Sequence, residues 1–473
     1  MKTRPRNNSR RLLACCCALL ALCSAWSWAD GGPTPVAELR AANPVETWRR
    51  SDVPVLPPNY NLHAVVSETL INRILSQSDA ETRGVQDRIL GANIFGVQMT
   101  DTRLSVDCQP APANMRLMMQ LHGITRSNTV GIRQEARINT LGCYRFGVFK
   151  PVFFDARMFS TSSAMARVYA HNSNRGVRTP VTGTPLVGPL FDRFVYAAAE
   201  RQKPQGEAIA ARKLAEQVLP RFNRTIDAQL AELNGQLQVQ IIEPLQKYEM
   251  QPDQQSLVST DHYVRYSARS PSVSNRPIET SAPPAMPPGN LFCVHESLLA
   301  LAIDRFEFAG RAFTAQDLRW LTETLQRFGL AREDLSGPEL NPVTDLATFV
   351  FDEVDPLRIR IDDGEIEVVS RVRIEPAIGN PLPLQQVRVT LVPVLEGDVL
   401  TLQPRDIDVR GVDGAVEPGM MLIQGVVRDQ VEKLLTSAEF NRTWTPPLTN
   451  VDEFSLRLRS LTADDGWLAI EFE

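Results

Sequence analysis

Four acidic side chains lie close together in the second half of the chain, where they could hold a metal ion or act in acid–base catalysis. Two of them alternate with isoleucine and valine, so a strand would carry them on its outward face. The other two precede a glycine and fit a turn. The pattern therefore favours a solvated strand and turn over a carboxylate site. The four residues are Asp362, Asp363, Glu365 and Glu367.

Other reactive residue types are scattered. His295-Glu296 resembles the start of a zinc-protease helix, but Leu299 stands where the second histidine is required. Asp352 and Asp355 fit a strand-entry turn better than a calcium site. We find no nucleophile elbow, phosphate loop or dinucleotide fingerprint in a fitting context. The sequence does not decide whether a serine or cysteine acts as a nucleophile, because the partners of such a residue need not be near it in sequence. We predict no catalytic, metal or cofactor site.

The N-terminal segment 1–29 has the pattern of a secretory signal peptide. Five basic residues precede an apolar stretch of about 14 residues, and a small-x-small motif ends at Ala29. This stretch is short of the roughly 20 residues of a membrane-spanning helix. We therefore expect cleavage after Ala29 and export to the periplasm or the extracellular space.

Beyond the signal peptide, charge and cysteines narrow the class of protein. Loss of five basic residues changes the formal net charge from −5 to about −10, which makes nucleic acid and anionic membranes poor partners. No other stretch is apolar enough to span a membrane. Three cysteines remain, and they fit either a Cys108–Cys143 disulfide with Cys293 free, or three buried thiols.

The first half should contain short helices, a β-meander and one long helix. Residues 30–60 are rich in proline and should be extended. A helix should follow Ser67, and a second helical segment is expected at 85–90. Alternating residues from 104 to 154 predict the meander. The long helix should run from about 207 to 237, with Pro220 bending or interrupting it.

One apolar stripe follows this long helix at spacings of three and four residues, over some 45 Å. The stripe could line an elongated apolar groove or could be packed core. Its residues are Leu214, Val218, Phe222, Ile226, Leu230, Leu233 and Leu237.

The second half should repeat a similar order of elements. Residues 268–290 have the composition of a proline-rich linker. A helix is expected from Thr314 to Gly329, a hairpin around Asp363-Gly364, similar turns at Gly397, Gly414 and Gly466, and a helix at about 420–435. Val66-Ser67-Glu68-Thr69-Leu70-Ile71 and Val294-His295-Glu296-Ser297-Leu298-Leu299 begin the two halves alike, which favours a tandem duplication.

The predicted fold class is therefore α+β, with two similar tandem units, each a curved antiparallel sheet packed around or against a long helix. The expected units span residues 61–267 and 291–473, after a signal peptide at 1–29 and an extended segment at 30–60, with the linker at 268–290.

This layout resembles the tubular lipid-binding superfamily, of which the bactericidal/permeability-increasing protein is the two-unit type. The matched starts, the stripe from Leu214 to Leu237, the proline-rich join and the length carry the resemblance. No motif is specific enough to transfer residue by residue. The shorter helix of the second half and the acidic charge depart from the pattern. The resemblance implies a non-enzymatic protein that binds lipid or another apolar ligand at the cell envelope, without a cofactor. An envelope protein with filled cores, or a hydrolase, is the alternative.

Overall fold

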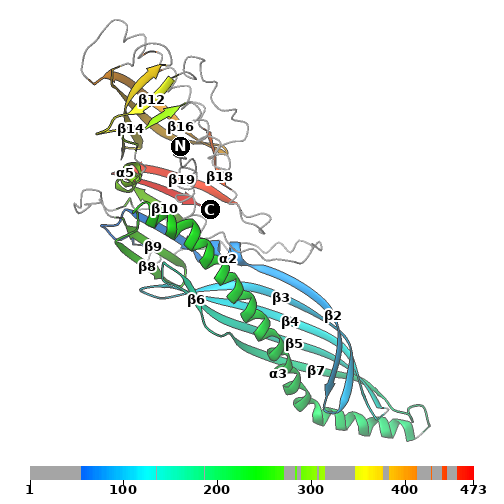
Figure 1. The fold of residues 1–473 in the computed structure, drawn as a ribbon. Helices are drawn as coiled ribbons and strands as arrows, with labels where there is room; N and C mark the ends of the chain where they lie inside the picture. The colour runs from blue at the N-terminus through cyan, green and yellow to red at the C-terminus, as the bar shows by residue number, and fades with distance from the viewer. Residues whose placement is uncertain are drawn as a thin grey trace, which may run out of the picture. The chain divides into compact units, whose positions relative to one another are not determined.

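A computed structural model describes residues 55–134, 136–185, 187–270, 283–284, 289–305, 308–314, 347–376, 383–412, 425, 428, 439–444 and 455–473 (Figure 1). The described residues are mostly β-sheet, with 55% in strands and 25% in helices. Three sheets and one long helix replace the two similar α+β units expected from the sequence, so that prediction of the fold class is wrong. The prediction fails because strands from both halves of the chain combine in one sheet.

The chain forms two compact units that do not follow its two halves. Unit 1 comprises the described residues within Met1–Leu70, Pro112–Asn114 and Leu233–Glu473, and unit 2 comprises Ile71–Ala111 and Met115–Glu232. Most of the predicted linker 268–290 lies outside the described residues, as do the predicted cleavage site and most of the predicted segment 30–60. The domain boundaries expected from the sequence stay a prediction.

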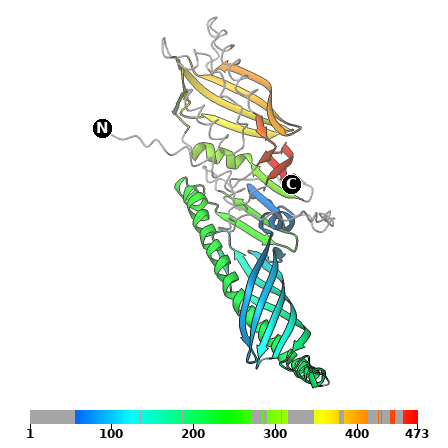
Figure 2. The ribbon, with the colours of Figure 1, turned by 90° about the vertical axis from the view of Figure 1, so that its right-hand side faces the viewer.

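Unit 2 is built on a six-stranded antiparallel sheet of long strands (Figures 1 and 2). The β-meander predicted for residues 104 to 154 is confirmed, since three of these strands cover that range. The prediction of a helical segment at 85–90 is wrong, because residues 85–89 belong to an edge strand, whose polar sequence hides its alternation, and Leu90 lies in the turn that follows. The strands are β2 (Gln77–Ile89), β3 (Ala92–Gln109), β4 (Met115–Arg133), β5 (Ala136–Phe154), β6 (Phe159–Thr161) and β7 (Met165–Arg178).

The long helix α3 (Val187–Leu237) lies along one face of this sheet (Figure 2). The expected helix is present but begins at Val187, well before the predicted start near 207, and its assignment runs unbroken through Pro204 and Pro220. Lys150 on β5 joins the sheet to α3: its buried Nζ donates to Ser162 O at 2.9 Å and to Asn223 Oδ1 at 2.7 Å. Asp227 completes the contact with an ion pair of 3.0 Å to Lys150.

The central sheet of unit 1 brings the two matched segments of the sequence together. The strand before each matched helix pairs antiparallel with the other, with Ala64 opposite Phe292. Ser67 caps the first helix as predicted, since its Oγ accepts a bond from Leu70 N at 3.1 Å. The sheet has seven strands in the order β18-β19-β20-β10-β1-β9-β8. Its strands and the two helices are β1 (Leu62–Ser67), α2 (Glu68–Leu75), β8 (Gln254–Ser259), β9 (Tyr263–Arg269), β10 (Asn290–His295), α5 (Glu296–Arg305), β18 (Thr443–Trp444), β19 (Leu456–Asp464) and β20 (Trp467–Phe472).

The remaining sheet of unit 1 contains two of the predicted hairpins, and the third, at Asp465-Gly466, joins β19 to β20 of the central sheet. Asp363-Gly364 and Asp465-Gly466 have positive φ at both positions, as the tight hairpin turn requires, and Gly397 turns the next hairpin. The turn expected at Gly414 and the helices expected at 314–329 and 420–435 lie outside the described residues, except Thr314, which belongs to a strand, and the isolated positions 425 and 428. The strands are β11 (Ala312–Thr314), β12 (Ala347–Phe351), β13 (Leu357–Asp362), β14 (Glu365–Pro376), β15 (Gln385–Glu396), β16 (Val399–Gly411) and β17 (Glu439–Asn441).

Candidate functional site

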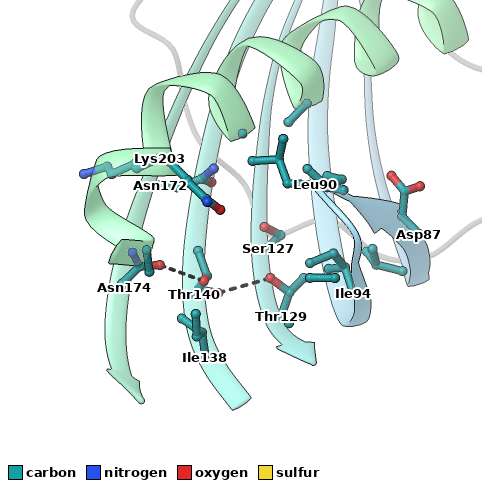
Figure 3. A pocket seen from close by; sticks show the side chains of 18 of the residues that line it. Asp87, Leu90, Ile94, Ser127, Thr129, Ile138, Thr140, Asn172, Asn174 and Lys203 are labelled. Carbon is teal, nitrogen blue, oxygen red and sulfur yellow. Dashed lines mark hydrogen bonds between the residues drawn. The ribbon is translucent and has the colours of Figure 1, made fainter. Parts of the chain in front are cut away.

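A cavity of about 780 Å³ lies within unit 2, between α3 and the face of the sheet that α3 covers (Figure 3). The helix contributes residues between Phe191 and Gln217, and the sheet contributes residues of β2, β3, β4, β5 and β7. Cavities of about 300–1,000 Å³ hold small ligands in proteins. The size of this cavity is therefore that of a ligand site.

The floor of the cavity is polar across its middle. Alternation along the strands turns every second residue toward α3, and the strand register places these residues in three adjacent rows across the sheet. All of them are uncharged. We call them the polar belt: Thr129, Thr140 and Asn174 in one row, Gln98, Ser127 and Asn172 in the next, and Thr125 and Tyr144 in the third.

On either side of the polar belt the same face becomes apolar. Toward the turns that join β2 to β3 and β4 to β5, the next row contains Ile94 and Ile138, which line the cavity. In the opposite direction the face continues into the buried core, with Phe146 and Val148 on β5. The helix adds Phe191 and Leu214 to the lining. The cavity floor is thus polar over the belt and apolar over the adjacent row of Ile94 and Ile138, with Arg133 at the rim beyond.

Hydrogen bonds within the polar belt fix several of its side chains. The Thr140 hydroxyl donates to Asn174 Oδ1 at 3.0 Å, and the Tyr144 hydroxyl donates to Asn172 Oδ1 at 2.9 Å (Figure 3 shows the first). Burial raises the pKa of Tyr144, which keeps this hydroxyl protonated. Ser127 Oγ is buried near Tyr144 without meeting the geometry of a hydrogen bond. The belt is pre-organised, with donor and acceptor capacity still directed into the cavity.

Polar contacts join α3 to both edges of the sheet. On the β7 side, Asn174 Nδ2 donates to Glu200 Oε1 at 2.8 Å, and Asn172 N donates to Glu207 Oε1 at 2.7 Å. On the β2 side, Lys213 forms an ion pair with Asp87. These contacts hold the helix across the cavity.

Most charged groups of the lining have charged partners in the protein. Besides the Lys213–Asp87 pair, Lys203 lies 3.8 Å from Glu200, and Glu216 lies 3.6 Å from Arg212. On β3, β4, β5 and β7 the one charged residue among the described lining residues is Arg133, at the last position of β4. The floor on these four strands therefore carries almost no charge, whereas the edge strand β2 adds Arg83 and Asp87.

The predicted stripe of α3 divides between cavity and core. Leu214 lines the cavity, and Val218 is half-buried outside the lining. The other five are buried and do not belong to the lining: Phe222, Ile226, Leu230, Leu233 and Leu237. Whether the stripe forms a groove for a ligand stays a prediction, and its C-terminal part is packed core.

Apolar residues extend beyond the cavity along the start of α3. Val187, Leu190, Phe191 and Phe194 are exposed and occupy one helix face at spacings of three and four residues. Phe191 belongs both to this exposed stripe and to the cavity lining. The apolar part of the cavity is thus continuous with an exposed apolar helix face.

The cysteines do not form the disulfide considered from the sequence. Cys108, Cys143 and Cys293 are free. Cys108 lies opposite Leu117 and Cys143 lies opposite Arg126, nine residues further along β4, which corresponds to about 30 Å. A disulfide needs Cα atoms within about 7 Å. Burial raises the pKa of the Cys293 thiol to about 12, so it remains protonated.

Several of the acidic residues considered in the sequence analysis form ion pairs with arginines. Glu365 pairs with Arg405, Glu367 lies 3.1 Å from Arg388, and Asp355 lies 3.4 Å from Arg371. Asp362 and Asp363 approach Asp464 in an exposed group of carboxylates. Exposed acidic groups of this kind are common without a metal, and no further feature of the group points to one.

His295 and His63 each contact a serine within unit 1. His295 Nδ1 accepts from Ser297 N at 3.2 Å, at the start of α5. His63 Nδ1 lies 2.9 Å from Ser267 Oγ, a separation that a nucleophile and its base would also have. Both His63 and Ser267 are completely buried, so this pair has no access for a substrate.

Sequence reasoning missed the polar belt. Its signal was present in the alternation of Thr125, Ser127 and Thr129, where a strand of an ordinary core would carry large apolar residues. The significance of these residues depends on β5 and β7 adding polar residues at the same level. That register cannot be read from one strand alone.

Comparisons with known proteins identify no family for this chain. No family model matches the chain, and no curated protein matches it. Among solved structures, a crystal structure of lipopolysaccharide binding protein is similar with a TM-score of 0.32 and 11% sequence identity, over 88% of this chain and 98% of that chain. So low a score supports no conclusion about function. No helix among the described residues is long and apolar enough to cross a membrane.

Proposed function

We propose that the protein is an exported, non-enzymatic carrier that binds a lipid-like amphipathic molecule in the cavity of unit 2. The observation that supports this proposal is the cavity of about 780 Å³, whose floor has a polar part and an adjacent apolar part. An envelope protein with filled cores would have no cavity beyond a few hundred Å³ at this place. The exported location rests on the predicted signal peptide.

The apolar part provides the favourable free energy of binding. Burying apolar surface yields about 25 cal/mol per Å², so an alkyl chain gains affinity wherever Ile94, Ile138, Phe191 and Leu214 remove it from water. The exposed stripe at the start of α3 continues this surface. A chain longer than the cavity would follow the stripe outward.

Fluorescence titration with N-phenyl-1-naphthylamine, an uncharged apolar probe, tests the proposal. We expect saturable binding to the full chain, with fluorescence enhanced and blue-shifted. Ala210 lines the cavity from α3, and Ala210→Trp should fill part of it and weaken binding at least about tenfold. Ala228→Trp is the matched control, because Ala228 is exposed on the same helix and lies outside the lining.

Two outcomes would contradict the carrier proposal. The first is the absence of saturable probe binding by protein whose thermal unfolding is cooperative. The second is equal weakening of binding by the two tryptophan variants, since the probe would then bind elsewhere. Native mass spectrometry of the purified protein gives an independent measurement, in which a bound lipid-sized mass is expected and should be lost in the Ala210→Trp variant.

A further inference from the structure

We infer that the ligand has an uncharged head group with several hydroxyl groups, such as a sugar or glycerol, and that the polar belt binds this head group. This inference rests on the proposed function and adds the chemical class of the ligand. It follows from the kind of polar side chains on the floor, their position within the cavity and the pairing of the nearby charges.

The polar belt has the chemistry of hydroxyl recognition. Hydroxyl and amide side chains can each donate and accept, so they match a ligand hydroxyl, which does both. The belt consists of threonine, serine, tyrosine, asparagine and glutamine on four adjacent strands. Ser127 Oγ is more than nine-tenths buried beside the Tyr144 hydroxyl, which already donates to Asn172, so Ser127 keeps hydrogen-bonding capacity for a ligand. A buried polar atom of this kind loses free energy unless a ligand or water satisfies it.

A charged head group would find little compensation on this floor. Burying an ion is costly unless an opposite charge or several hydrogen bonds compensate it. The lining cations Lys203 and Lys213 already face Glu200 and Asp87, and the lining anion Glu216 faces Arg212. Of the two lining arginines without a printed acidic partner, Arg133 lies at the end of β4, beyond the apolar row of Ile94 and Ile138, and Arg83 is exposed on the edge strand β2, opposite Gln98. The belt residues on β4, β5 and β7 lie two or more strands away from Arg83, whose exposed charge is solvated.

The order of the rows also assigns a direction to the ligand. The head group lies over the belt, and the chain extends over Ile94 and Ile138 toward Phe191 and the exposed stripe of α3. Glycines keep the floor open below it: a Cβ at Gly142 would lie 2.5 Å from Ser127 Oγ and 2.6 Å from the Tyr144 hydroxyl. A larger residue there would displace the polar groups that bind the head group.

Competition among amphiphiles with one chain length tests the inference. Dodecyl glucoside, monododecanoyl glycerol, dodecanoate, dodecyl phosphate and dodecyltrimethylammonium, each below its micelle concentration, compete with bound N-phenyl-1-naphthylamine. Two or more hydrogen bonds to a neutral head group, each worth about 3- to 10-fold in affinity, predict at least about a tenfold preference for the glucoside and the glycerol ester.

Matched variants identify the belt as the source of that preference. Ser127→Ala combined with Thr129→Val removes two belt hydroxyls with little change of volume, and it should reduce the preference for neutral heads to within about threefold while probe binding is retained. Ser173→Ala is the control, since Ser173 lies opposite Leu141 on the outer face of β7 and should leave the preference unchanged.

The outcomes separate the inference from the proposed function. If charged amphiphiles compete as well as neutral ones or better, or if the double variant keeps the preference, the inference is overturned and the carrier proposal stands. If neither the probe nor any amphiphile binds, both are overturned. Probe binding with tenfold weaker competition by every charged compound supports both.

Discussion

His63 is an ionisable side chain kept neutral inside the central sheet of unit 1. Burial, with a further contribution from Arg265, lowers its pKa from 6.5 to about 4. Nδ1 is bonded to Ser267 Oγ, and Nε2 is buried without a hydrogen-bond partner. The ring also packs against Trp467, with centroids 5.3 Å apart. A proton added to this ring would bring a positive charge into the core without an acceptor for Nε2.

The pH dependence of stability follows from this shift. Between pH 6.5 and about 4 the unfolded chain binds a proton at His63 that the folded chain does not, so the free energy of unfolding decreases as the pH falls through this range. The full loss is roughly 3 kcal/mol. We expect the melting temperature of the wild type to fall more steeply than that of His63→Phe between pH 7 and 4, measured by differential scanning calorimetry.

The exposed His122 supplies the control for this experiment, and His122→Gln should keep the steep wild-type pH dependence. Burial also lowers the pKa of His295, which leaves a smaller acid dependence in the His63→Phe variant. Parallel curves for the wild type and His63→Phe would contradict the assignment of the acid dependence to His63.

At the scale of elements, two hairpin turns of the same type meet in unit 1. Gly364 N donates to Ala463 O and Gly466 N donates to Ile361 O, each at 2.7 Å, so the β13–β14 and β19–β20 turns bind each other. Gly364 has φ of 81° and Gly466 has φ of 83°. The two glycines therefore adopt the same left-handed backbone conformation. They differ in their neighbours.

Substitution of these glycines separates backbone strain from packing. Gly364→Ala should cost about 1–2 kcal/mol, because an L-residue is strained at this φ and a Cβ meets nothing within 4 Å. Gly466→Ala adds a clash, since its Cβ would lie 2.6 Å from His295 Nε2. That ring is held by Ser297 and Trp467, so we expect a further loss of about 1–3 kcal/mol in urea unfolding. Equal losses would show that the ring moves aside without cost.

Turn chemistry and strong periodicity made these elements readable from the sequence. Asp363-Gly364 and Asp465-Gly466 identify their turns because a tight hairpin turn requires positive φ at both central residues, and Ser67 identifies a helix start. β2 was missed because as an edge strand it buries little and shows weak alternation. The N-terminal part of α3 was missed because its apolar face is exposed at the start and then lines a cavity with small residues such as Ala198 and Ala199.

At the scale of the whole molecule, the arrangement differs more from the sequence-based prediction than the individual elements do. The resemblance between the starts at Val66 and Val294 suggested two similar halves in succession, whereas β1 and β10 pair with each other in one sheet of unit 1. Pairing between segments so distant along the chain leaves no local pattern. The cavity was expected only as one face of a helix, because the register of four strands determines its floor.

The division into units predicts where a ligand acts. A ligand that binds only the folded state at 100 times its dissociation constant stabilises that state by about 2.7 kcal/mol. Because the cavity lies entirely in unit 2, saturating N-phenyl-1-naphthylamine should slow hydrogen exchange in β4, β5 and residues 191–217 of α3 by up to about 100-fold. Exchange in β1, β9 and β10 should not change. The Ala210→Trp variant should show neither effect. Protection confined to the central sheet would place the ligand in unit 1 and contradict the site, because no cavity-lining residue belongs to that unit.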